Sequence, residues 1–102
     1  MKIENMKHKN AEVFKTSFYF GGNMLVYDII EIDNEKVIMR RMRYLLGAFY
    51  SVSIPLSNVV HVDVCKRERG AEILIESYTH SHIVSKGYSL ASAHKIKQLI
   101  QP

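Results

Sequence analysis

The chain has 102 residues, of which 47% are hydrophobic and 24% are charged. This length fits one domain with one core, and the balance of residue types is that of a globular protein rather than a disordered or membrane-spanning one. Fourteen Lys and Arg against ten Asp and Glu leave a formal charge of +4, which is compatible with nucleic acid, anionic lipid or an acidic protein partner. A single cysteine, Cys65, excludes an intramolecular disulfide and a four-cysteine zinc site.

The first residues are polar and charged and show no usable periodicity. They predict a loose basic N-terminal arm at 1–11, followed by a single domain at 12–102. The arm lacks an apolar run of the length that a secretion signal needs. The longest largely apolar stretch, 44–56, is too short to cross a bilayer. We therefore expect a cytoplasmic protein that is at most peripheral to a membrane.

Short runs rich in Val, Ile, Phe and Tyr follow one another from residue 12, separated by turn-forming clusters with Gly, Asn, Asp or Pro. This spacing is typical of a mainly β fold. The runs predict seven strands, near 12–20, 24–32, 36–43, 48–54, 59–66, 71–77 and 82–86.

Alternation along three consecutive strands predicts which side chains face the core. Each of these strands has one apolar face and one mixed face, because successive side chains of a strand point to opposite sides. The apolar faces contain Tyr50, Val52, Ile54, Val60, Val62, Val64, Ile73 and Ile75. Such a sheet must close on itself or be covered by another element.

One amphipathic helix is predicted over 89–101. Ser89 can cap its first turn, and Lys95 and Lys97 lie toward the carboxyl end, where the helix dipole favours cations. A single apolar stripe provides one docking surface, which consists of Ala93, Ile96, Leu99 and Ile100.

Two segments carry a resemblance to a known family. Residues 53–64 read Ser-Ile-Pro-Leu-Ser-Asn-Val-Val-His-Val-Asp-Val, in which a strand ends in an Ile-Pro-Leu-Ser turn and a Val-rich strand follows. Residues 70–76, Gly-Ala-Glu-Ile-Leu-Ile-Glu, then precede the helix. Together with seven strands and one final helix, this order resembles the bacterial pleckstrin-homology-like (PH-like) domain family over roughly residues 24–100.

The resemblance implies a mainly β, PH-like barrel of about seven antiparallel strands closed by one C-terminal α-helix. It also implies a scaffold for binding or self-assembly without catalysis. It does not imply inositol phosphate binding, because the lipid-binding members place a Lys on one strand and a basic-x-Arg pattern on the next. In this chain Lys36, Arg41 and Arg43 fall on one predicted strand.

No residue pattern indicates an enzyme, a cofactor or a metal. Cys65 shares a predicted strand face with His61 and Asp63, but same-face neighbours along a strand are about 7 Å apart, too far for direct hydrogen bonding. His80 and His82 could reach one metal from an extended segment, yet no third ligand lies nearby in the sequence. We therefore expect no catalytic residue, no metal and no cofactor.

One segment stands out as a candidate binding element. Three arginines directly precede a predicted hairpin tip with large apolar side chains, whereas exposed tips are normally polar. The predicted binding residues are Arg40, Arg41, Arg43, Tyr44, Leu45, Leu46 and Phe49. The alternative is that Leu45, Leu46 and Phe49 plug the barrel.

We expect a non-catalytic PH-like interaction module that self-associates or docks a protein partner, through the apolar hairpin or an unpaired strand edge. The alternative is a small basic barrel that binds nucleic acid or an anionic membrane surface. Self-association is favoured because the sequence shows no second membrane signal beside the hairpin, and stable anchoring needs two.

Overall fold

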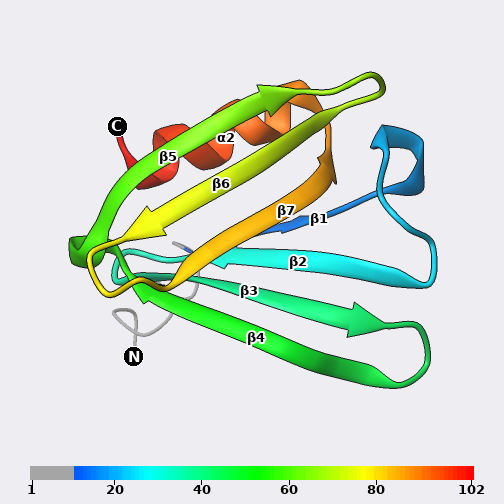
Figure 1. Cartoon of the computed structure of the whole chain (residues 1–102), viewed down its shortest axis with the longest axis horizontal. Coiled ribbons are helices and arrows are strands. Elements are labelled where there is room, and N and C mark those ends of the chain that lie inside the picture. The colour runs from blue at the N-terminus through cyan, green and yellow to red at the C-terminus, as the bar shows by residue number, and fades with distance from the viewer. Residues whose placement is uncertain (1–10) are drawn as a thin grey trace, which may run out of the picture.

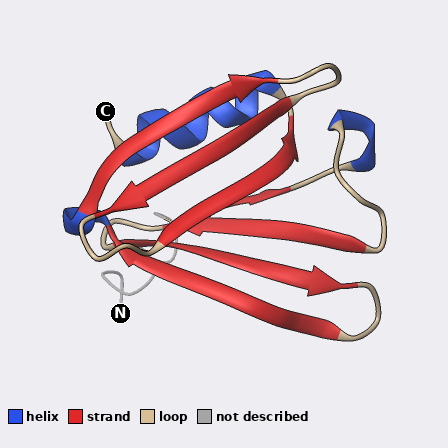
Figure 2. Cartoon of the chain, viewed as in Figure 1, coloured by secondary structure: helices blue, strands red, loops and turns tan. Residues whose placement is uncertain are grey.

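A computed structural model describes residues 11–102, and it contains two antiparallel sheets and one C-terminal α-helix (Figures 1 and 2). The first sheet has the order β1 (Glu12–Lys15), β2 (Val26–Ile32), β3 (Lys36–Arg43) and β4 (Gly47–Pro55). The second has the order β5 (Val59–Lys66), β6 (Ala71–Ser77) and β7 (His82–Tyr88). The predicted mainly β fold of seven antiparallel strands is confirmed, and the predicted arm at 1–11 lies outside the described residues except for Ala11.

The first strand is shorter than predicted. It ends at Lys15 rather than at residue 20, and a short 3₁₀ helix, η1 (Phe18–Phe20), follows. The Ser17 hydroxyl accepts a hydrogen bond from the Tyr19 amide at 3.1 Å, and this local bond competes with strand pairing. Aromatic residues with high strand propensity are thus held in a capped turn. A second 3₁₀ helix, η2 (Leu56–Asn58), joins the two sheets after Pro55.

The predicted alternation locates most of the core. Ile54, Val62, Ile73 and Ile75 are fully buried. Val60 and Tyr50 are exceptions, since 49% of each is exposed, and Tyr50 lies beside the irregularity in the pairing of β3 with β4. The pairing of β5 with β6 shifts register between Val59 and His61, and a one-residue slip turns a side chain to the opposite face.

The C-terminal helix, α2 (Leu90–Ile100), packs its predicted stripe on the core. Ala93, Ile96 and Ile100 are buried, and Leu99 is partly buried against them. The Ser89 hydroxyl accepts a hydrogen bond from the Ser92 amide at 3.1 Å, so the predicted N-cap is confirmed.

The helix also bridges one flank of the two sheets. Lys95 Nζ lies 3.1 Å from Glu12 Oε1 on β1, and Gln101 Nε2 donates to the Val60 carbonyl on β5 at 3.3 Å. No strand pairing joins the two sheets within residues 11–102, so the pairings form two sheets rather than one closed barrel. On the other flank, β4 and β7 are edge strands.

The two ends of the molecule carry different loops (Figure 1). One end holds η1, the rest of the β1–β2 loop, the β3–β4 hairpin turn and the β5–β6 turn. The β1–β2 loop is held against β7, because the Ser17 amide donates to the Gly87 carbonyl at 2.8 Å. Gly87 has a φ of 114°, and a Cβ there would lie 2.9 Å from the Gly22 Cα. Only glycine permits this close approach, so the body of the fold positions the loop.

Candidate functional site

The hairpin between β3 and β4 presents an unusual turn. The turn covers residues 44–46, and the Leu46 amide donates to the Arg43 carbonyl at 2.9 Å. Leu45 has a φ of 67° and Gly47 a φ of 83°. Glycine adopts this left-handed conformation readily, whereas for a residue with a Cβ the conformation costs about 1–2 kcal/mol of backbone energy. The tip therefore holds a leucine where backbone energetics favour glycine or asparagine.

Two of the three predicted arginines are already paired within the chain. Arg40 Nη1 donates to Glu31 Oε1 at 2.9 Å, and Arg41 Nε donates to Asp28 Oδ1 at 2.7 Å. They are neighbours on one strand, so they point to opposite faces of the sheet. The structure therefore does not bring Arg40, Arg41 and Arg43 together as one basic cluster.

The apolar side chains of the hairpin lie in solvent. Leu45 is 87% exposed and Leu46 is 73% exposed, while Tyr44 and Phe49 are each about half exposed. The Arg43 guanidinium lies 4.5 Å from the centre of the Phe49 ring. For Leu45 and Leu46, such exposure does not agree with the alternative in which Leu45, Leu46 and Phe49 plug the barrel, and Phe49 is half exposed.

A second apolar loop lies beside the hairpin, and sequence reasoning missed it. The Tyr44 amide donates to the Leu25 carbonyl at 2.8 Å, which ties the hairpin to the β1–β2 loop. A depression of about 270 Å³ between them is lined by side chains that include Phe18, Met24 and Tyr44. We call the joint surface the apolar end; its exposed members are Phe18, Tyr19, Met24, Leu25, Tyr44, Leu45 and Leu46.

The sequence did contain a signal for this loop. The stretch 18–25 reads Phe-Tyr-Phe-Gly-Gly-Asn-Met-Leu, which places large apolar residues on both sides of a Gly-Gly-Asn turn. The strands predicted at 12–20 and 24–32 absorbed these residues, because Phe and Tyr have high strand propensity.

Three cations lie around the apolar end. None of the ion pairs found within residues 11–102 includes them, in contrast to Arg40 and Arg41. Each is instead close to an aromatic ring of the same region, where a cation interacts favourably with the ring face. The distances to the ring centres are 4.5 Å for Lys15 over Tyr27, 4.5 Å for Arg43 over Phe49 and 5.2 Å for Arg69 over Phe18.

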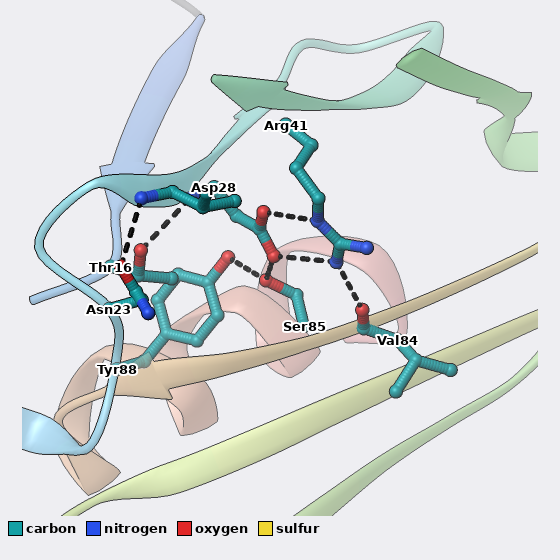
Figure 3. A network of polar contacts seen from close by, with 8 residues as sticks. Thr16, Asn23, Asp28, Arg41, Val84, Ser85 and Tyr88 are labelled. Carbon is teal, nitrogen blue, oxygen red and sulfur yellow. Dashed lines mark hydrogen bonds and ion pairs between the residues drawn. The ribbon is translucent and has the colours of Figure 1, made fainter. Parts of the chain in front are cut away.

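A second cluster, which is buried and polar, joins the two sheets (Figure 3). Arg41 binds the Asp28 carboxylate with two nitrogens, at 2.7 and 2.9 Å, and its Nη2 also donates to the Val84 carbonyl at 3.0 Å. The Ser85 hydroxyl donates to Asp28 Oδ2 at 2.5 Å and lies 2.6 Å from the Tyr88 hydroxyl. We call Asp28, Arg41, Ser85 and Tyr88 the polar latch, because it connects β2 and β3 to β7.

The latch has the electrostatics of a structural network. The hydrogen bond with Asp28 raises the pKa of the Arg41 guanidinium. Burial raises the pKa of Tyr88 well above its ordinary range, and so keeps the hydroxyl protonated. Among residues 11–102 no buried side-chain nitrogen or oxygen lacks a hydrogen-bond partner. The latch was missed in the sequence because its members lie far apart along the chain.

A cleft of about 490 Å³ lies over the latch and is lined by residues that include Asp28, Arg41, Glu72 and Lys86. The Ser85 hydroxyl contacts the Asp28 carboxylate, but Ser85 is 2% exposed, and its side-chain hydrogen-bond partners within residues 11–102 are Asp28 and Tyr88. Nucleophilic catalysis by serine needs a base that removes the hydroxyl proton at an accessible site. The contacts of this cluster tie β2 and β3 to β7.

Among the other candidate residues from the sequence, His82 lines a further depression together with Arg41 and Phe49. Cys65 is exposed and has no disulfide partner. His82 Nδ1 lies 3.4 Å from the His80 carbonyl, and both rings belong to the β6–β7 region. Within residues 11–102 no three His, Cys, Asp or Glu side chains are grouped as metal ligands would be.

In the part of the chain that the structure describes, no helix has both the length and the apolar character needed to cross a membrane. Comparison of the chain with protein-family models, with curated proteins and with solved structures finds no match.

Proposed function

We propose that this chain is a non-catalytic interaction module of PH-like architecture that docks onto its partner through the apolar end. The order of seven antiparallel strands and one C-terminal helix supports the PH-like assignment. One observation carries the docking proposal: seven large apolar side chains from two adjoining loops are exposed together.

Single exposed apolar residues are normal, whereas contiguous apolar patches on the order of several hundred Å² mark interaction sites. The conformation of the tip supports the same proposal. Leu45 adopts a left-handed backbone and is 87% exposed, so it contributes neither favourable backbone energy nor core packing to the fold. A residue that is unfavourable for the free protein on both counts is typical of a binding element.

The test is a double variant, Leu45→Ser with Leu46→Ser, compared with Tyr78→Ser. Tyr78 is also an exposed apolar residue, but it lies in the β6–β7 turn at the opposite end (Figure 1). Association is measured by sedimentation, with the protein alone at rising concentration and with lipid vesicles. The double variant is expected to weaken association by about tenfold or more, since each leucine contributes about 1.5–3 kcal/mol when buried. Its melting temperature is expected to stay within a few degrees of the wild type.

Three results would overturn the proposal. One is a wild type that associates in neither format, and another is an association that the double variant leaves unchanged. The third is a fall of many degrees in the melting temperature of the double variant, because that result would place the two leucines in the core. Tyr78→Ser is expected to change neither association nor melting temperature.

A further inference from the structure

We infer that the partner of the apolar end is an anionic membrane surface. This inference rests on the proposed function and names the partner class for the same surface. Sequence reasoning favoured self-association because only the hairpin was visible as a membrane signal. The structure places a second apolar loop beside it, and both loops project from the same end of the molecule (Figure 1).

The shape of the apolar side chains fits insertion between lipids. Leu45 and Leu46 lie at the tip of one loop, and Met24 and Leu25 lie on the other. Protruding loop tips can enter a bilayer without any change in the sheets behind them. Tyr44 and Tyr19 are amphipathic, and such rings are favoured at the level of the lipid headgroups.

The charge around the tips is complementary to an anionic surface. Lys15, Arg43 and Arg69 take part in none of the ion pairs within residues 11–102. Attraction of each cation to anionic headgroups raises affinity by roughly fivefold, and cations beside an inserted apolar group supply the second signal of stable peripheral binding. An interface between two copies of this end would bring the same cations face to face, where they would repel.

The chain contains no tryptophan, so a single introduced tryptophan can serve as a fluorescence reporter of its own position. Leu45→Trp places a single tryptophan at the tip, and Tyr78→Trp places one at the opposite end. On vesicles of phosphatidylcholine with about one third phosphatidylglycerol, the Leu45→Trp emission is expected to shift to the blue and to be quenched by brominated lipid. The Tyr78→Trp emission is expected to stay unchanged.

The charge contribution is tested separately on the same vesicles. Arg43→Gln and Arg69→Gln are each expected to lower affinity for anionic vesicles by roughly fivefold and to leave binding to pure phosphatidylcholine unchanged. Lys36→Gln removes the same unit charge at the start of β3, at the opposite end, and is expected to change neither. Equal losses in all three variants would show a general charge effect and overturn the inferred orientation.

The outcomes separate this inference from the function on which it rests. A wild type that ignores vesicles but self-associates, with loss in the Leu45→Ser, Leu46→Ser variant, would overturn the membrane inference and retain the docking module. Binding to a single-stranded oligonucleotide without binding to vesicles would also overturn it. A wild type that neither binds vesicles nor self-associates would overturn both.

Discussion

The polar latch and the apolar end both reverse the usual distribution of side chains. The latch buries an aspartate that is only 6% exposed, and the apolar end exposes leucines that a soluble domain normally buries. The two regions differ in whether the chain itself supplies the partner. Asp28 accepts hydrogen bonds from Arg41 and Ser85, whereas Leu45 and Leu46 are largely exposed and uncovered by any other part of residues 11–102.

This difference assigns the two regions to different tasks. A buried charge that is fully paired can persist in a free protein, because its desolvation is offset within the fold. An exposed apolar cluster gains nothing from the free fold and is stabilised only when something else covers it. We therefore expect changes in the latch to alter stability and changes in the apolar end to alter binding.

The largest expected effect is on the latch. Asp28→Ala leaves the Arg41 guanidinium and the Ser85 hydroxyl without their carboxylate partner. Removing one partner of a fully buried ion pair costs about 3–5 kcal/mol. Arg41 keeps a third of its side chain in solvent, so we expect a somewhat smaller loss, about 2–4 kcal/mol. Urea unfolding at neutral pH measures this difference.

A second variant keeps this prediction specific to the pair. Asp28→Ala combined with Arg41→Met removes both charges, and it is expected to recover a large part of the lost stability. If the double variant lost as much as the sum of the two single variants, the ion pair would not be the source of the effect. Vesicle binding of the folded Asp28→Ala protein is expected to equal that of the wild type.

A smaller effect concerns the pH dependence of the latch. Burial raises the pKa of Tyr88 above its ordinary value of about 10. The stability that this group contributes is therefore complete below pH about 10 and is lost as the pH rises toward the folded-state pKa, because the unfolded chain releases the proton first. We expect the wild type to lose about 1 kcal/mol more than Tyr88→Phe between about pH 9 and about pH 11. Parallel stability curves of the two proteins over that range would contradict the buried, protonated hydroxyl.

The sequence predicted the regular elements better than it predicted either region. Strands and helix follow from local periodicity, and residues such as Ile75 and Ile96 are buried as expected. The latch depends on pairs that are 13 residues apart for Asp28 and Arg41 and 57 apart for Asp28 and Ser85. No local pattern marks such pairs. Only the fold shows that the Asp in the strand 26–32 meets an arginine and a serine rather than solvent.

Of the two loops that form the apolar end, the sequence predicted only the β3–β4 hairpin, for a related reason. The hairpin residues, such as Leu45 and Leu46, stand out because a turn is locally recognisable and is normally polar. The β1–β2 loop does not stand out, because aromatic residues in 12–20 fit a strand as well as a capped 3₁₀ turn. The contact between Tyr44 and Leu25 that unites the two loops is tertiary. That contact could therefore be found only in the structure.

The smallest expected effect compares two turns with the same backbone conformation. Leu45 has a φ of 67° at the apolar end, and His80 has a φ of 66° in the β6–β7 turn. Asparagine tolerates this conformation better than leucine, whereas histidine is already among the residues enriched there. Leu45→Asn is therefore expected to stabilise the free fold by about 0.5–1 kcal/mol, and His80→Asn to change it by less than about 0.5 kcal/mol.

Vesicle binding should move in the opposite direction to stability for Leu45→Asn, because the change removes an apolar side chain from the tip. A stabilised protein with weakened binding would show that the leucine is retained for its partner at the expense of the fold. His80→Asn should leave binding unchanged, since its turn lies at the other end of the molecule (Figure 1). A Leu45→Asn protein that was less stable than the wild type would instead mean that Leu45 packs within the free fold. The apolar end would then belong with the latch as part of the structure, and the separation of the two regions would fail.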